Sequence, residues 1–239
     1  MENQELNYQD FTAEVQKESS EAFPILMRKV YVWMTFALVI TGMTAYYVAT
    51  SPTLLTAILT NRILFYGLII AELALVFGIS AAINRLSLLV ATILFILYSI
   101  INGATMSVIF LAYEISSIAT VFFITAGTFG AMAVIGYTTK RDLSSMGRIM
   151  FMGLIGLVIA TAVNIFLKSP MMTRILSYVG VIVFVGLTAW DSQKIKKMLL
   201  QAPDVDEAAQ KMALLGALTL YLDFINLFIY LLNILGKRR

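Results

Sequence analysis

Four acidic residues lie within or at the ends of long apolar stretches: Glu72, Glu114, Asp191 and Asp223. A charged Asp at the centre of a membrane helix costs about 2.5–3.5 kcal/mol on insertion scales, so it is tolerated mainly where it faces protein or water. Asp223, Glu72 and the amide Asn226, one turn beyond Asp223, are therefore candidate functional residues. Glu114 follows the end of an apolar stretch, and we expect it at a solvated rim.

The chemistry open to this chain is that of carboxylates, because it contains neither histidine nor cysteine. Thiolate chemistry, disulfides and Cys-based metal sites are excluded. Histidine is the one side chain that ordinarily titrates between pH 5 and 8, so a pH response near neutrality would have to come from carboxyl groups. Oxygen ligands of this kind suit a hard cation such as calcium.

Asp191 and Asp223 lie on consecutive apolar stretches, which must run antiparallel if both are helices joined by a loop. Asp191 can then lie beside the carboxylate of Asp223. The residues leave a second interpretation open, in which Asp191 is an interfacial residue neutralised by Lys194 or Lys196.

The composition defines the elements that must position these residues. Of the 239 residues, 60% are hydrophobic, well above the roughly 45–50% of soluble proteins. This length allows six or seven membrane spans of about 20 residues and leaves no room for a second globular domain. The net charge is +3, and its bases lie in short clusters between apolar stretches, so we expect no nucleic-acid partner.

Seven apolar stretches predict an all-α polytopic membrane protein in which the lipid bilayer surrounds a helical bundle over residues 23–239. The predicted helices cover residues 30–50, 63–83, 88–113, 118–137, 149–167, 175–190 and 212–235. Residues 1–22 are polar and mostly acidic, which indicates a disordered or loosely helical cytoplasmic tail rather than a signal peptide.

Lysines and arginines in the short loops predict a cytoplasmic N-terminus. Ten would lie inside: Arg28, Lys29, Arg85, Lys140, Arg141, Arg148, Lys194, Lys196, Lys197 and Lys211. Three would lie outside: Arg62, Lys168 and Arg174. The C-terminal bases of residues 237–239 disagree, because a complete seventh crossing places them outside, whereas a re-entrant hairpin around Asp223 keeps them inside. We favour the complete crossing.

Closely spaced glycines are expected where helices approach one another in lipid. The pairs are Gly127 with Gly130, Gly153 with Gly156, and Gly180 with Gly186.

Several motifs resemble those of the Bax inhibitor-1 family (transmembrane Bax inhibitor motif proteins), in its bacterial form. They are Trp-Asp-Ser-Gln-Lys-Ile at 190–195, Leu-Tyr-Leu-Asp-Phe-Ile-Asn-Leu-Phe at 220–228, Gly-Tyr-Thr-Thr-Lys-Arg-Asp-Leu-Ser at 136–144, and the embedded Glu72. The resemblance covers residues 23–236. Two features depart from the family: Ser107-Val108 stand where the third helix often has a proline, and the segment between the two aspartates, including residues 199–207, is longer.

This resemblance implies six helices around a central seventh, and a pH-sensitive calcium leak controlled by Asp191 and Asp223. Glu72 would be associated with the gate. A proton shared by two close carboxyl groups would join the sixth and seventh helices, and its loss would add repulsion and open a path. Asp191 and Asp223 would hold calcium transiently, with Glu72 and Asn226 along the path. We expect no cofactor, since calcium is the transported ion and protons are the signal.

The sequence is also compatible with two other functions. One is a proton-coupled cation exchanger, and the other is a membrane adaptor that regulates a membrane protease or a stress-response partner. We expect no enzyme activity, because an intramembrane aspartyl protease would need a second motif that is absent from this sequence. We further expect a monomer rather than an obligate oligomer, in the cell inner membrane, with an organelle membrane as the alternative.

Overall fold

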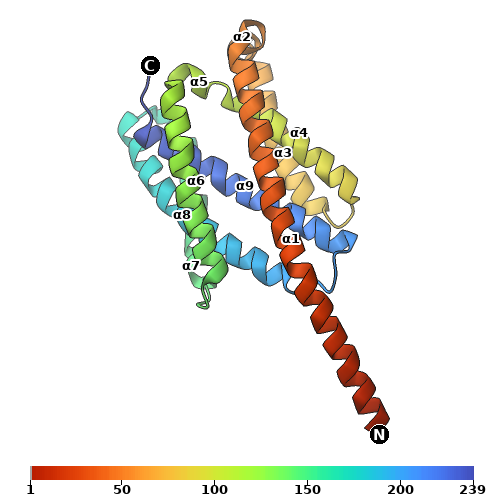
Figure 1. Ribbon diagram of the computed structural model, residues 1–239. Helices are drawn as coiled ribbons and strands as arrows, with labels where there is room; N and C mark the ends of the chain where they lie inside the picture. The colour runs from red at the N-terminus through yellow and green to blue at the C-terminus, as the bar shows by residue number, and fades with distance from the viewer. Residues whose placement is uncertain (1) are drawn as a thin grey trace.

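Helices run through the whole of the chain that the structure describes (Figure 1). This computed structural model describes the backbone of residues 2–239 and the side chains of residues 21–239. Its helices are α1 (Glu2–Thr50), α2 (Pro52–Thr60), α3 (Arg62–Ala82), α4 (Leu88–Met106), α5 (Ile109–Ala112), α6 (Ile115–Thr138), α7 (Ser144–Leu167), α8 (Pro170–Leu199) and α9 (Glu207–Leu235).

Seven stretches are long and apolar enough to cross a bilayer, which confirms the predicted all-α polytopic fold. They are Glu21–Thr50, Arg62–Ala82, Leu88–Ala112, Ile115–Thr138, Ser144–Leu167, Pro170–Leu199 and Glu207–Leu235. The prediction ended the sixth helix at residue 190 or 191 and began the seventh at 212, whereas α8 continues to Leu199 and α9 already begins at Glu207. Polar residues at these ends lower the local hydropathy, but the backbone hydrogen bonds continue, so the helices extend beyond the apolar stretches.

Short polar side chains begin several of these helices. Asn61, Ser87, Ser169 and Asp206 each accept a hydrogen bond from the backbone N–H three residues further on, which satisfies one of the free donors at a helix start. The prediction missed α2, which begins at Pro52 between the first two spans.

The third span is interrupted at Ser107 and Val108, the residues that replace the proline common in the family. Helix α4 ends at Met106 and α5 begins at Ile109. The Ser107 hydroxyl donates to the Ala104 carbonyl at 2.7 Å, and the backbone N–H of Ser107 donates to the same carbonyl oxygen at 3.3 Å. This chain therefore forms a helix break here without proline.

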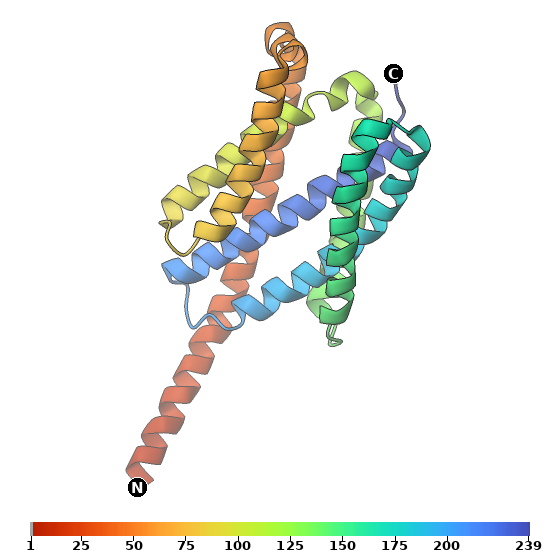
Figure 2. The ribbon, with the colours of Figure 1, turned by 180° about the vertical axis from the view of Figure 1, so that it is seen from behind.

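Helix α9 lies at the centre of the bundle (Figures 1 and 2). In its most apolar stretch 67% of the residues are buried, against 6% in α3 and in α7. Helices α1, α4, α6 and α8 pack directly on α9, while α3 packs chiefly on α4 and α7 chiefly on α8. The predicted central seventh helix is confirmed, and α3 and α7 form the outer flanks.

The structure favours a complete crossing by α9 over a re-entrant hairpin. Its 29 residues form one unbroken helix about 43 Å long, more than the roughly 30 Å hydrocarbon core. In the residues that follow α9, the Lys237 carbonyl accepts a hydrogen bond from the backbone N–H of Glu114 at 3.0 Å. The C-terminus thus lies beside the α5–α6 connection, at the opposite end of the molecule from the N-terminus (Figure 1).

The basic C-terminal residues contact acidic and aromatic side chains at this end of the molecule. Lys237 Nζ lies 3.0 Å from Glu114 Oε1, and the Arg238 guanidinium lies 5.9 Å from the Tyr113 ring centroid. Local pairing explains how these bases are stabilised on the side that the loop count assigns to the exterior.

The glycine prediction is correct for some positions and wrong for others. Gly153, Gly180 and Gly186 face the side chains of Val183, Tyr230 and Met150, so they serve packing as expected. A Cβ added at Gly127, Gly130 or Gly156 would meet nothing within 4 Å. These three glycines do not form close helix contacts.

Helix α1 runs without interruption from Glu2 into the first span, and its first part extends beyond the other helices (Figure 1). The predicted acidic tail falls mainly on residues 1–20, whose side chains lie outside the described part.

Candidate functional site

The carboxyl groups of Asp191 on α8 and Asp223 on α9 lie within hydrogen-bonding reach of each other. Both side chains are buried, with exposed fractions of 7% and 4%. One oxygen, Asp223 Oδ2, has no hydrogen-bond partner among the described residues. Two ionised carboxylates have no proton to donate, so a hydrogen bond between these groups requires that one of them be protonated.

The lengthened α8–α9 hairpin produces this pairing. Helix α8 continues to Leu199, α9 begins at Glu207, and a short connection joins them. Gly216 of α9 packs against Ile195 of α8, and Gly180 of α8 packs against the ring of Tyr230. The longer segment between the aspartates consists mainly of this connection, at residues 200–206, so it does not displace the pair.

Neither lysine proposed as a neutralising partner forms an ion pair with Asp191 in the described part of the chain. Lys194 Nζ lies 5.0 Å from the centroid of the Trp190 ring and acts on Asp191 only through its charge. Lys196 Nζ donates to the Tyr137 carbonyl at 2.8 Å. The geometry therefore favours the carboxyl pair over the interfacial interpretation of Asp191.

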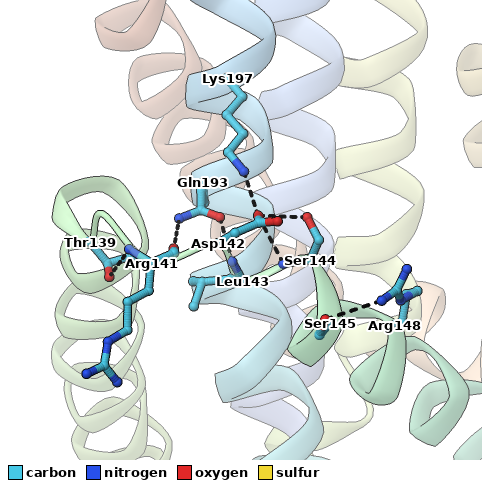
Figure 3. Close-up of polar contacts among 9 residues, drawn as sticks. All are labelled: Thr139, Arg141, Asp142, Leu143, Ser144, Ser145, Arg148, Gln193 and Lys197. Atoms are coloured by element: carbon cyan, nitrogen blue, oxygen red, sulfur yellow. Dashed lines mark hydrogen bonds and ion pairs between the residues drawn. The ribbon is translucent and has the colours of Figure 1, made fainter.

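Two residues just beyond Asp191 bind the loop between α6 and α7 (Figure 3). The Gln193 side chain accepts from the Leu143 N–H at 2.9 Å and donates to the Arg141 carbonyl at 2.8 Å. Lys197 Nζ lies 2.7 Å from Asp142 Oδ1. The motifs at 136–144 and 190–195 thus form one contact, which we call the Gln193–Lys197 clamp. Both motifs are recognisable in the sequence, but nothing in the sequence predicted that they bind each other.

Asp142 in this clamp is a carboxylate of a different kind. The hydrogen bond from Lys197, followed by those from the Ser144 hydroxyl and backbone N–H, lowers the pKa of Asp142 to about 2. Its side chain is exposed, so it stays ionised throughout the neutral range.

Glu72 lies apart from the aspartate pair, on the side of α3 that faces α4. Its carboxylate accepts from Thr105 Oγ1 at 2.6 Å and from Asn102 Nδ2 at 3.3 Å. Its partners in the described part of the chain are therefore a hydroxyl and an amide of the neighbouring helix α4.

The Glu72 contact continues to α9 through Tyr221. The Tyr221 hydroxyl donates to Asn102 Oδ1 at 2.9 Å and lies 2.7 Å from Thr41 Oγ1. Residues two apart on a helix point about 200° away from each other, so Tyr221 and Asp223 lie on opposite sides of α9. The structure brings Asp191 and Asp223 together and places Glu72 beyond the opposite face of the central helix.

Asn226 does not join the aspartate pair through a hydrogen bond in the described part. Its Nδ2 donates to the Leu222 carbonyl of its own helix at 2.8 Å. No group of three or more acidic, His or Cys side chains that could hold a metal occurs among the described residues. Since calcium takes six to eight oxygen ligands, the two carboxyl groups alone do not form a complete calcium site.

A cavity of about 770 Å³, which we call the outer vestibule, lies at the end of the α8–α9 contact that is further from the loop joining these helices. Ser177 and Asn233 are among its polar lining residues, and Lys168, Arg174 and Arg238 are its cations. Phe184 and Tyr230, with ring centroids 5.8 Å apart, lie between this vestibule and the aspartates along the two helices. Ser177, Phe184 and Asp191 recur every seven residues, so they share one face of α8.

A buried carboxyl pair between the central helix α9 and its neighbour α8 in a seven-span bundle defines a polytopic helical membrane protein with an ionisable core. The family described as "Inhibitor of apoptosis-promoting Bax1" matches residues 24–239. The chain belongs to this family, as the motifs predicted.

Bacterial relatives cover nearly the same region. An Escherichia coli (strain K12) protein named "Inner membrane protein YbhL" is 53% identical over 214 residues, which is 89% of this chain and 92% of the relative. An uncharacterized protein of Borreliella burgdorferi is 45% identical over 213 residues, again 89% and 92% of the two chains. One of Rickettsia prowazekii is 43% identical over 231 residues, or 95% and 96%. Together with the seven candidate spans, these matches identify a multi-pass protein of the cell inner membrane.

Proposed function

We propose that this protein is a pH-sensitive calcium leak channel whose closed state is stabilised by a proton shared between Asp191 and Asp223. One observation carries the proposal: the two carboxyl groups meet, buried, between the central helix α9 and its neighbour α8. No ion pair compensates them among the described residues.

The mechanism follows from the charge of the pair. With one shared proton, a carboxyl group donates to the neighbouring carboxylate and holds α8 against α9. When that proton leaves, two negative charges repel each other in a medium of low dielectric constant, where charges interact much more strongly than in water. The helices then separate, and carboxylate oxygens become available to a passing cation.

The path in this proposal runs along the contact between α8 and α9. Phe184 and Tyr230 separate the outer vestibule from the aspartates in the present conformation, which therefore represents a closed state. Because Tyr230 packs on Gly180, a small separation of the two helices would release the ring.

Calcium flux into proteoliposomes at several pH values tests the proposal. Wild-type flux should rise as the pH rises and the shared proton is lost. Asn can donate a hydrogen bond to the remaining carboxylate at every pH, so Asp191→Asn and Asp223→Asn should hold flux near the low-pH level and remove its pH dependence.

Asp142→Asn is the matched control, because it makes the same chemical change in an aspartate that stays ionised from pH 5 to 8. It should keep the wild-type profile. If both pair variants instead behave like wild type, in flux and in its pH dependence, the aspartates do not gate the protein and the proposal fails.

The same vesicles distinguish a channel from an exchanger. A channel moves calcium only down its electrochemical gradient. Uphill calcium movement driven by an imposed pH difference would replace the channel proposal with coupled exchange.

A further inference from the structure

Helices α1 and α6 leave two pockets between them, one above the other. The inner pocket, of about 520 Å³, is lined by α1 residues from Pro24 to Met34 and by α6 residues from Phe129 to Tyr137. The outer pocket, of about 290 Å³, continues along the same two helices and reaches α9 at Phe224. Lining positions on both helices recur at three- and four-residue intervals, so a single face of each helix borders both pockets.

Glycines leave free space on the faces of α1 and α6 that line the pockets. Gly130 lines the inner pocket and Gly42 the outer one, and a Cβ on either would meet nothing within 4 Å. Gly136, one and a half turns beyond Gly130 on α6, instead lies directly against the Ala189 backbone. The free space beside Gly130 is therefore a feature of the pocket, since α6 packs tightly elsewhere, at Gly136.

The inner pocket is apolar along its walls and basic at one end. Arg28 lines it and has no ion-pair partner among residues 21–239, whose side chains the structure describes. Phe23 and Tyr137 stack with ring centroids 6.2 Å apart and close the base between the helices. Lys196 adds a second cation 4.9 Å from the Tyr137 ring. The loop charges place this end at the cytoplasmic surface.

The size of the pockets and the positive charge at the inner end indicate which kind of molecule binds there. The outer and inner pockets, of about 290 and 520 Å³, are lined almost wholly by apolar side chains. A flexible acyl chain fits a narrow apolar space that opens to the bilayer. Basic pockets between membrane helices on the cytoplasmic side bind anionic lipid headgroups, and that leaflet is rich in anionic lipid.

We propose that the inner α1–α6 pocket binds one anionic phospholipid of the cytoplasmic leaflet. Its acyl chain lies against Met27, Tyr31 and Gly130, and its headgroup phosphate binds Arg28. This site is independent of ion conduction, because it rests on the pocket, the open glycine and the cation alone.

Native mass spectrometry of the purified full-length protein tests the proposal, with phosphatidylglycerol as the probe and phosphatidylcholine as the neutral comparison. Wild type should retain one phosphatidylglycerol in preference to phosphatidylcholine. Gly130→Leu fills the pocket and should abolish this preferential binding. Arg28→Gln leaves the packing intact and should weaken it about fivefold, since one cation near an anionic lipid contributes about 1 kcal/mol.

Each variant has a matched control. Gly42→Leu makes the same substitution in the outer pocket, and Arg85→Gln removes another exposed cation of the inner side; both should bind as wild type does. Equal binding of the two lipids, or equal loss in variants and controls, would overturn the proposal. A dimer that Gly130→Leu dissociates would also overturn it, by identifying a second copy of the chain as the occupant.

Discussion

Asp142 and Asp223 carry the same functional group in opposite surroundings. Asp142 is exposed, binds Lys197 and keeps a pKa of about 2, whereas Asp223 is buried against a second carboxyl group. One aspartate is thus an exposed, ion-paired charge in the loop, and the other is buried beside a second carboxyl group at the centre of the bundle.

The lowered pKa of Asp142 predicts how its contact responds to acid. Because the folded-state pKa lies below the ordinary value of 3.8, the contact stabilises the fold above about pH 4 and is lost as the pH falls towards 2. The difference in thermal midpoint between wild type and Asp142→Asn should be small, nearly constant from pH 8 to 4, and should decrease between pH 4 and 2 as the folded-state carboxylate is protonated. A difference that instead grows below pH 4 would contradict the assignment.

Tyr221 provides a second prediction at this scale. Replacing it with Phe keeps the rings that pack on Phe95 and Tyr98 but leaves buried Asn102 Oδ1 without its donor. An unsatisfied buried acceptor costs about 1–3 kcal/mol, so thermal unfolding in detergent should show Tyr221→Phe destabilised by that amount. Tyr66→Phe, at a ring that is 61% exposed on α3, should change the stability little.

Helix α6 approaches α8 most closely at Gly136. A methyl group there would overlap the Ala189 carbonyl, so Gly136→Ala must push the helices apart. Overpacking of this kind costs about 1–3 kcal/mol, and the variant should unfold at a lower temperature than wild type. Gly127→Ala, on the same helix but facing open space, is the control and should be neutral or slightly stabilising. Equal behaviour of the two would mean that α6 and α8 are not in contact at Gly136.

The outer vestibule between α7, α8 and α9 carries three cations, which would repel an entering cation. If calcium enters here, as the proposed path requires, Arg174→Gln should raise calcium flux at least roughly twofold at 10 mM salt. The effect should disappear at 1 M salt, where the Debye length falls to about 3 Å. Arg62→Gln, at the start of α3, should have no such effect. An unchanged flux in Arg174→Gln would place the entry elsewhere.

The whole molecule has one orientation in the membrane, with its two termini at opposite ends (Figure 1). Because the chain contains no cysteine, single-cysteine variants report each position without background. In intact cells with a permeabilised outer membrane, Thr53→Cys and Arg239→Cys should react with a membrane-impermeant maleimide, and Gln201→Cys should react only after lysis. Protection of Arg239→Cys before lysis would show that the C-terminus lies inside.

At this scale α9 connects two polar clusters that lie far apart in the sequence. Asp223 faces Asp191 on α8, and Tyr221 reaches Glu72 through Asn102 on α4. A change in the position of α9 would therefore alter both clusters at once.

The sequence by itself determined the membrane class and the seven spans, and it identified Asp191 and Asp223 as candidate site residues. Hydropathy depends only on residues that are close in the chain. A carboxylate within 20 apolar residues can therefore be recognised without knowing which side chain it contacts. Helix ends were less accurate, as at residues 190 and 212, because a helix continues through polar residues that end a hydrophobic stretch.

Only the tertiary structure decided which polar groups meet. The partners of Glu72, the binding of the α6–α7 loop by Gln193 and the open faces of Gly127 and Gly130 depend on how each helix is rotated about its axis. Lipid surrounds the bundle with an environment as apolar as its core, so hydrophobic periodicity gives little information about that rotation. Packing and hydrogen bonds between helices set it instead, and these involve residues 30 to 180 positions apart.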